Sequence, residues 1–298
     1  MFIFKELGFV NRFPLRAWPD NLTYNYFMGI PLAILGGGNI GLSMARGLVK
    51  SGKYVPSEIS ITRRNTGLLA DMAELGYHTS HSNSVAVARS GIIMLSVLPQ
   101  QLNALLEEIK PAIDARRHLV ISVVTGVSIS DIKHILGINL AVTRAMPNTA
   151  IAVGQSMTCL SYDELSSGRK EEIAAIFETV GIQTEIKEEL MIPATALAAC
   201  SIAFFLRAIR AATQGGVEIG FHTSDALKIA LQVAKGASML LENPGTHPER
   251  EIDKVTSPRG CTIAGLNEME HYGFSSAMIR GIKTSADKAG KLYEKSND

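Results

Sequence analysis

The chain has 298 residues, which is enough for two domains that each bury a hydrophobic core. Hydrophobic residues make up 46% of it and charged residues 19%, proportions typical of an ordinary globular protein. The net charge of +1 gives no field that would attract nucleic acid or an anionic membrane surface, and we see no run of about 18 apolar residues suited to span a bilayer. We therefore expect neither a nucleic-acid nor a membrane partner.

Residues 1–27 precede the first recognisable element and lack the charged and apolar regions of a signal peptide. They are interpreted as a loose extension or as the product of an upstream translation start, and we assign them no function. We expect the first folded domain to begin at Met28.

The most informative segment is a glycine-rich turn that follows a short apolar run, Leu32 to Leu35. A helical pattern and a second apolar strand, 59–61, come after it, which is the order of a βαβ dinucleotide site. The turn would cradle the pyrophosphate on free N–H groups at the helix N-terminus. Gly36 would allow the sharp turn, Gly38 the approach of the phosphates, and Gly41 close helix–strand packing. The alternative is a glycine-rich turn without a ligand, but the surrounding elements favour the dinucleotide site. The predicted binding residues are Leu35, Gly36, Gly37, Gly38, Asn39, Ile40 and Gly41.

The end of the second strand selects the cofactor. A site selective for NAD places Asp or Glu about 20 residues beyond the glycines, on the ribose 2′-hydroxyl. Residues 60–65 contain no acid, and Arg63 and Arg64 lie where they could contact a 2′-phosphate. A guanidinium group can form two parallel hydrogen bonds to phosphate oxygens, so we predict NADP(H), with NAD as the alternative cofactor. The competing interpretation is a solvated basic corner.

Strand-like and helix-like segments then alternate, which predicts a parallel sheet covered by helices on both faces. The expected strands are 92–97, 119–124 and 140–146, and the expected helices are 101–109 and one from about Ser128. Two further edge strands, 156–162 and 183–186, would flank a helix at 168–180, with Gly181 as its C′ residue. We expect this Rossmann-type, doubly wound α/β domain to cover residues 28–188.

Residues 189–298 predict a second, all-helical domain. A mostly apolar helix at 191–220 should be buried on several sides, and its length suggests that a partner chain covers part of it. Thr223-Ser224-Asp225 could cap a helix that runs to about Glu242. Shorter helices are expected at 247–256, 262–272 and 276–294, with Gly273 as the C′ residue of the middle one.

Two places could hold a substrate beside the cofactor. The strand ends at 96–99, 123–126 and 146–148 are small or end in Pro, so backbone could approach a nicotinamide ring. In the helical domain, residues 255–265 combine hydroxyls, Pro and Gly ahead of a helix, where N–H groups could hold a carboxylate. This stretch has no His, Asp or Glu to act as a general acid, which fits a substrate whose nitrogen is already protonated. For both segments the alternative is ordinary loop and helix-capping chemistry.

Several segments together resemble the pyrroline-5-carboxylate reductase family. They are LGGGNIG, the strand ending in SVLPQ, VISVVTGVSIS, RAMPNTAIAVG and VTSPRGCTIAGLNEMEHYGF, in this order between about residues 30 and 290. The resemblance implies reduction of a cyclic imine carboxylate with NADPH, the last step of proline synthesis. It also implies a Rossmann domain and a helical dimerisation domain, in a homodimer or a larger ring.

The resemblance assigns further roles by position. The residues implied to line the cofactor are Asn83, Ser96, Val97, Leu98, Pro99, Val123, Val124, Thr125, Asn148 and Glu188, the last near the nicotinamide ribose. The residues implied to bind the substrate are Thr256, Ser257, Gly260, Cys261 and Thr262. Thr262 and Ser257 would be catalytic, with the Thr262 hydroxyl beside the imine nitrogen. No metal site is implied.

The chain also departs from the family. Leu98 stands for Lys, Arg210 for an acid, Arg259 for Gly and Cys261 for Thr or Ala, and residues 198–204 differ from a Ser-Gly-Ser-Gly-Pro-Ala-Tyr-like helix start. Arg207, Arg210 and Arg259 would suit a substrate with an additional anionic group. The alternative is ion pairing with acids such as Glu218 or Glu242, or across a dimer interface.

Three functions remain open at this point: reduction of pyrroline-5-carboxylate, reduction of another cyclic imine, and NADP binding without catalysis. Retained Ser257 and Thr262 favour an enzyme, and the altered helix start favours the last. The three widely separated cysteines, Cys159, Cys200 and Cys261, indicate reduced thiols and predict a cytoplasmic protein.

Overall fold

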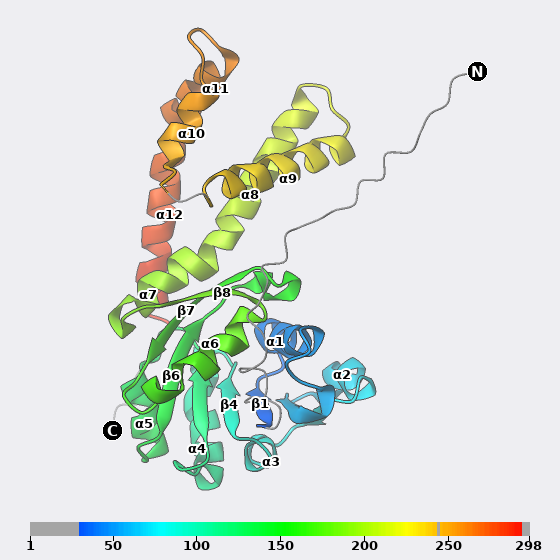
Figure 1. The fold of residues 1–298 in the computed structure, drawn as a ribbon, viewed down its shortest axis with the longest axis vertical. Helices are drawn as coiled ribbons and strands as arrows, with labels where there is room; N and C mark the ends of the chain where they lie inside the picture. The colour runs from blue at the N-terminus through cyan, green and yellow to red at the C-terminus, as the bar shows by residue number, and fades with distance from the viewer. Residues whose placement is uncertain (1–29, 243–244, 294–298) are drawn as a thin grey trace, which may run out of the picture.

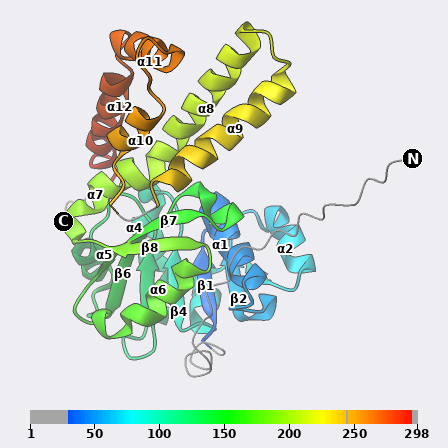
Figure 2. The same cartoon turned by 45° about the horizontal axis from the view of Figure 1, so that its top comes forward.

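The structure is a computed structural model that describes residues 30–242 and 245–293. An α/β layer forms one end of the molecule, and two helical arms rise from it (Figures 1 and 2). The predicted N-terminal extension, 1–27, lies outside the described residues, as does the end of the last predicted helix. The last strand of the described ranges ends at Glu185, and the elements that follow it there are helices.

The α/β layer is built on a sheet in the order β3-β2-β1-β4-β5-β6-β7-β8. Strands β1 to β6 are parallel as predicted, whereas β7 runs antiparallel to β6 and β8 runs parallel to β7. β8, and not β7, is an edge. The strands are β1 (Leu32–Leu35), β2 (Ile59–Thr62), β3 (His78–Ser80), β4 (Ile92–Leu95), β5 (Leu119–Ser122), β6 (Ala141–Met146), β7 (Ser156–Tyr162) and β8 (Gly181–Glu185). The sequence pattern missed β3, since this short edge strand is polar and half exposed.

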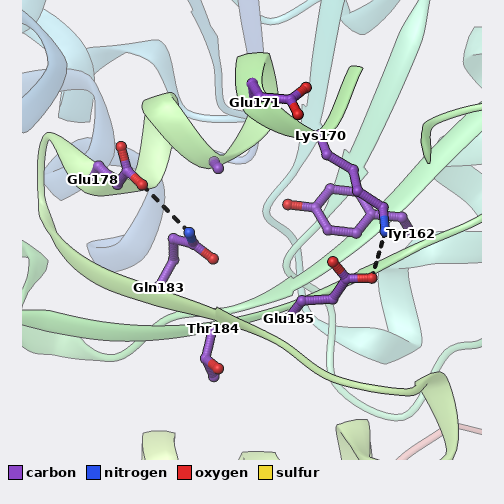
Figure 3. Close-up of a pocket in the computed structure, with 8 residues that line it drawn as sticks. Tyr162, Lys170, Glu171, Glu178, Gln183, Thr184 and Glu185 are labelled. Atoms are coloured by element: carbon purple, nitrogen blue, oxygen red, sulfur yellow. Dashed lines mark hydrogen bonds and ion pairs between the residues drawn. The ribbon is translucent and has the colours of Figure 1, made fainter. Parts of the chain in front are cut away.

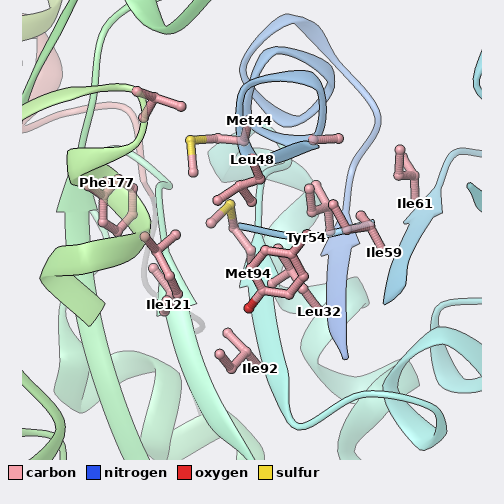
Figure 4. Close-up of a cluster of buried hydrophobic side chains, with 14 of the residues drawn as sticks. Leu32, Met44, Leu48, Tyr54, Ile59, Ile61, Ile92, Met94, Ile121 and Phe177 are labelled. Atoms are coloured by element: carbon pink, nitrogen blue, oxygen red, sulfur yellow. The ribbon is translucent and has the colours of Figure 1, made fainter. Parts of the chain in front are cut away.

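Helices cover both faces of the sheet. Alternate strand residues face opposite layers, so Leu32 and Ile34 enter one core while Ala33 and Leu35 enter the other. The first core packs under α1 (Asn39–Lys50) and α6 (Lys170–Glu178) and contains Phe177 (Figure 4). The second packs under α3 (Asn83–Ala88), α4 (Pro99–Ile109) and α5 (Ile129–Leu136). A short helix, α2 (Ala70–Glu74), lies before β3.

Three local predictions needed correction. Gly181 is not a helix C′ residue: α6 ends at Glu178 with Thr179 as its cap, and Gly181 begins β8. Its φ is +154°, and a Cβ there would lie 2.0 Å from the Ser156 carbonyl oxygen, so close strand pairing requires glycine. The strands before the cleft stop two residues early, at Leu95 and Ser122, and α4 starts at Pro99, where Pro suits the first helical position.

The helical part begins with η6 (Glu188–Leu190), α7 (Met191–Ala194), a π-helical segment (Thr195–Cys200) and α8 (Ser201–Glu218). α8 and α9 (Thr223–Leu240) form one arm (Figure 2). The other holds α10 (Pro248–Lys254), α11 (Cys261–His271) and α12 (Phe274–Ala289), and α12 returns to the sheet. α9 begins at Thr223, but its N-cap is His222 and no side chain caps it. Gly273, with φ +76°, follows the Tyr272 cap of α11, as predicted.

The long apolar helix is not buried on several sides in the single chain, contrary to expectation. On α8 only Ser201 and Thr213 are buried, whereas Phe205 is 63% and Leu206 59% exposed. Residues 188–218 form the only helix, among the described residues, long and apolar enough to cross a membrane by length and composition, so our expectation of no such run was wrong by this criterion. An apolar surface of this extent is also what a helix shows when another protein chain covers it.

Candidate functional site

A cleft of about 810 Å³ opens at the carboxyl ends of the central strands. Its walls are the loops that follow β1, β2, β4 and β5, together with one face of α4. The chain leaves β1 for β2 on one side and returns to β4 on the other, so the cleft lies at the switch point where open α/β sheets bind ligands.

The glycine turn forms the floor of the cleft. Gly36 has φ +113°, and a Cβ there would lie 2.3 Å from the Ser96 carbonyl oxygen. A Cβ on Gly41 would lie 2.4 Å from the Gly36 oxygen, so this residue allows the close packing that we expected. Gly38 caps α1 without a side-chain bond and has nothing within 4 Å of its Cβ position, which leaves room for phosphate.

The two arginines at the end of β2 differ in their contacts. Arg63 is half-buried, and its Nη1 donates to the Gly37 carbonyl at 3.0 Å, which ties β2 to the glycine turn. Arg64 is exposed in the same cleft wall. A 2′-phosphate bound here would meet one guanidinium held in place by the fold and one free to move.

Most of the predicted cofactor residues line this cleft. They are Gly36, Gly37, Gly38, Asn39, Ile40, Arg63, Arg64, Asn83, Ser96, Val97, Leu98, Pro99, Val123 and Thr125. Leu35, Gly41 and Val124 are buried behind its wall. Asn148 and Glu188 do not line it and make structural contacts elsewhere.

Asn148 joins the sheet to the helical part. Its Nδ2 donates to the Ala198 carbonyl in the π-helical segment at 3.0 Å, and its Oδ1 accepts from the Ala150 N–H at 2.9 Å. The side chain is 7% exposed. Asn148 therefore holds the start of the long helix against the end of β6.

Glu188 lies at the domain joint. Its Oε1 accepts from the Ile129 N–H, at the start of α5, at 2.7 Å and pairs with Arg144 Nη1 at 3.3 Å. Arg144 is buried, and its Nε and Nη2 have no hydrogen-bond partner. Burial lowers the pKa of Arg144 below its usual value, and the charge of Glu188 opposes that shift.

The sequence pattern missed several residues of the cleft: Thr62, Asn65, Leu68, His81, Gln101, Ala104, Leu105 and Glu108. The four on α4 recur at steps of three and four residues, as one face of a helix does. This spacing was visible in the sequence, but nothing there indicated that the face turns toward a ligand.

The predicted substrate residues lie apart from the cleft. The loop between α10 and α11 holds Thr256 and Ser257, Gly260 caps α11, and Cys261 and Thr262 form its first turn. None of these five residues lines the cleft. A single chain therefore does not bring the predicted substrate loop to the predicted cofactor site.

Arg259 adopts a conformation that favours glycine. Its φ is +58°, the only positive φ of a non-glycine residue in the described ranges. Gly260 N–H donates to the Ser257 carbonyl at 3.0 Å, so Pro258 and Arg259 are the central residues of a turn whose third position prefers Gly. None of the ion pairs among described residues involves Arg207, Arg210 or Arg259, so pairing with Glu218 or Glu242 is not seen.

A second hollow, of about 600 Å³, lies between α6 and the edge strand β8 (Figure 3). In it, Lys170 Nζ lies 2.6 Å from Glu185 Oε1 and 5.1 Å from the centre of the Tyr162 ring. Burial and the nearby glutamates raise the pKa of Tyr162 to about 12, so its phenol stays neutral at physiological pH. No glycine lines this hollow, so it lacks the turn that would let a pyrophosphate approach the backbone. Among the residues described, no three His, Cys, Asp or Glu side chains gather in a metal-binding group.

Comparison with known proteins was consistent in both parts of the chain. Residues 31–126 match the family described as NADP oxidoreductase coenzyme F420-dependent, and residues 188–292 match pyrroline-5-carboxylate reductase dimerisation. Structures of pyrroline carboxylate reductase from Plasmodium falciparum, with NADP bound, and of 1-pyrroline-5-carboxylate reductase from Streptococcus pyogenes superpose with TM-scores of 0.81 and 0.79. Their identities are 24% and 27%, over 89% and 88% of this chain and 99% of each of theirs.

Two relatives from Dictyostelium discoideum are more similar in sequence. Pyrroline-5-carboxylate reductase 1 is 50% identical over 88% of this chain, which spans 50% of that protein's length. Pyrroline-5-carboxylate reductase 2 is 45% identical over 87% of this chain and 92% of its own length. The chain therefore belongs to the pyrroline-5-carboxylate reductase family.

Proposed function

We propose that this protein reduces the C=N bond of 1-pyrroline-5-carboxylate with NADPH and so forms L-proline. The observation that carries the proposal is the cleft at the sheet's switch point, where a glycine turn meets two arginines that follow β2, in a segment (60–65) that contains no acid. The names of the relatives that match along both parts of the chain support the substrate.

The residues of the cleft fit NADPH. Gly38 leaves open space at the N-terminus of α1 for the pyrophosphate, and no acidic side chain stands in the first turn of that helix. Arg63 and Arg64 supply guanidinium groups for the 2′-phosphate. Ser96 to Pro99, Val123 and Thr125 form the part of the wall suited to a flat ring.

NADPH, when bound, supplies the hydride for the imine carbon. The chain's own residues orient the substrate. Backbone N–H groups around Gly260 to Thr262 hold its carboxylate, and the Thr262 hydroxyl forms a hydrogen bond next to the imine nitrogen. Because that nitrogen already carries its proton, no strong acid is required in the loop. Positioning then supplies most of the rate.

We propose further that the protein is a homodimer and that each cleft receives the substrate loop of the partner. The exposed apolar side chains of α8 and α9 offer the surface for a second copy. The match of residues 188–292 to a dimerisation family supports this assignment. Because the substrate loop lies apart from the cleft of its own chain, we place it in the cleft of the partner chain.

A second candidate substrate is a cyclic imine with an additional anionic group. Arg259 in the loop and Arg207 and Arg210 on α8 are exposed and have no acidic partner among the described residues. We also propose that the protein works in the cytoplasm, where its three free cysteines would stay reduced.

The proposed reaction is tested by following NADPH absorbance with pyrroline-5-carboxylate and, in parallel, with a dicarboxylic cyclic imine. We expect turnover of the first, and a Thr262→Ala variant should lose roughly a hundredfold in kcat while keeping its affinity for NADPH. Equal loss of turnover and NADPH affinity would indicate misfolding. NADPH binding without turnover of either imine would establish a non-catalytic protein, and faster turnover of the dianion would establish the second candidate.

The shared site is tested by mixing subunits of Thr262→Ala, which has a defective loop, with subunits of Gly38→Ala, which has a defective cleft. If each site joins two chains, half of the exchanged dimers are mixed and each has one intact site of two. We therefore expect about a quarter of wild-type activity to return after subunit exchange. No recovery, in material shown by sedimentation to contain mixed dimers, would place both parts of the site in one chain.

A further inference from the structure

A hydrogen-bond relay outside the glycine turn joins three elements at the adenosine end of the cleft. Asn83, the first residue of α3, donates from its backbone N–H to Glu108 Oε1 at 3.1 Å and from its Nδ2 to Glu108 Oε2 at 2.8 Å. Its Oδ1 accepts from the Thr62 hydroxyl, at the end of β2, at 2.6 Å. Thr62, Asn83 and Glu108 all line the cleft beside Arg63 and Arg64.

The relay has a fixed polarity that starts from Glu108. A carboxylate has no hydrogen to donate, so the Asn83 side chain must turn its NH₂ group toward Glu108 and its carbonyl oxygen toward Thr62. The Thr62 hydroxyl must then donate, which leaves its oxygen free to accept. If Glu108 were replaced by a group that can also donate, the Asn83 amide could rotate by 180° and exchange its donor and acceptor positions in the cleft.

Glu108 carries a negative charge and lies on the same wall of the cleft as the two arginines. The cofactor that we assign to this cleft carries up to four negative charges on its phosphates. As a simple charge, Glu108 would weaken binding of phosphates. Its two oxygens are instead both engaged by Asn83, and the Ser84 hydroxyl donates to its backbone carbonyl at 3.0 Å. These contacts indicate that Glu108 holds the Asn83 side chain in place.

We propose that Glu108 is a positioning residue, which fixes the orientation of Asn83 and thereby the donor and acceptor pattern offered to the adenosine ribose. The proposed contact is with ribose atoms that NADPH and NADH share, and not with the 2′-phosphate, so Glu108 acts on both cofactors alike. The inference rests on the proposed use of the cleft for a nicotinamide dinucleotide.

The test compares Glu108→Gln with Glu107→Gln and Arg64→Ala. Glu107, on the same helix, loses the same charge without touching Asn83, and it only pairs loosely with Lys110 at 3.8 Å. Arg64→Ala removes a group assigned to the 2′-phosphate. Dissociation constants of NADPH and NADH are measured directly by fluorescence titration, and KM and kcat are measured with the imine.

We expect Glu108→Gln to weaken NADPH and NADH by a similar factor of roughly 5–10, as for loss of a hydrogen bond to a charged group at a part-exposed site. Both kcat and the KM for the imine should stay near wild type. Arg64→Ala should weaken NADPH alone, and Glu107→Gln should change neither cofactor. Thermal unfolding of each variant separates a local effect from misfolding.

Two outcomes would overturn the role of Glu108. Tighter binding of NADPH in Glu108→Gln, without change for NADH, would mean that Glu108 acts only as a repelling charge. Unchanged binding of both cofactors would mean that Asn83 is held without it. Wild-type protein that binds neither dinucleotide would instead refute the proposed function itself, so the two failures are distinct.

Discussion

A Gly36→Ala variant is expected to be strongly destabilised and unable to bind NADPH. The residue has φ +113°, and the new Cβ would lie 2.3 Å from the backbone oxygen of Ser96, which cannot move aside as a flexible side chain can. We expect the free energy of unfolding to fall by roughly 3 kcal/mol, from left-handed strain and displacement of the β4 loop together. Thermal or denaturant unfolding measures the stability, and fluorescence titration measures NADPH affinity.

Gly38→Ala is the matched control. Gly38 has φ −88° and open space around its Cβ position, so the fold should tolerate Ala within about 1 kcal/mol. The added methyl would occupy the space assigned to the pyrophosphate, and we expect NADPH affinity to fall about tenfold or more. A Gly36→Ala protein as stable as wild type would show that the turn can relax, and unchanged affinity in Gly38→Ala would move the phosphates elsewhere.

A Glu188→Gln variant is expected to destabilise the joint between the sheet and the helical part. The side chain of Arg144 is 5% exposed, and Glu188, which is 35% exposed, is the only acid paired with it among the described residues. Gln can still accept from the Ile129 N–H, but the buried guanidinium loses its ion-pair partner and keeps only the electrostatic effect of Asp131. Breaking a fully buried pair costs roughly 3–5 kcal/mol, and partial exposure of Glu188 reduces the expected loss to roughly 2–3 kcal/mol.

The direction of the effect is checked by a second variant. Arg144→Met removes the buried charge, so combining it with Glu188→Gln should be less destabilising than Glu188→Gln alone. Glu189→Gln, at an exposed neighbouring position, should change stability by less than about 0.5 kcal/mol. A double variant that loses the sum of both single effects would show that the pair contributes nothing as a pair.

The location of the cofactor cleft was predictable because its requirements are local. A turn with positive φ at Gly36, a helix start without a side-chain cap and a strand followed by Arg63 and Arg64 are all properties of adjacent residues. β1 and β4 are apolar at every position, as expected for strands whose alternate residues enter cores on both faces of a sheet. The element types were therefore readable in the sequence, apart from short polar pieces such as β3.

Errors arose where a residue's role depends on a distant neighbour. Gly181 reads locally as the end of a helix, yet its need for glycine comes from Ser156 across the sheet. Asn148 and Glu188 remain predictions as cofactor residues, and the contacts that the structure shows for them, with Ala198 and Arg144, join residues 50 and 44 positions apart in the chain. Sequence spacing carries no information on such pairings.

The sequence by itself determined the dinucleotide turn, the change from strands to helices after residue 188 and the resemblance to one reductase family. Only the tertiary structure decided the reversed direction of β7 and β8, the relay from Glu108 through Asn83 to Thr62, and the distance of the loop at 255–260 from the cleft. The physical reason is that backbone conformation is set by neighbouring residues, whereas strand pairing, buried charge pairs and the covering of an apolar helix depend on what folds against them.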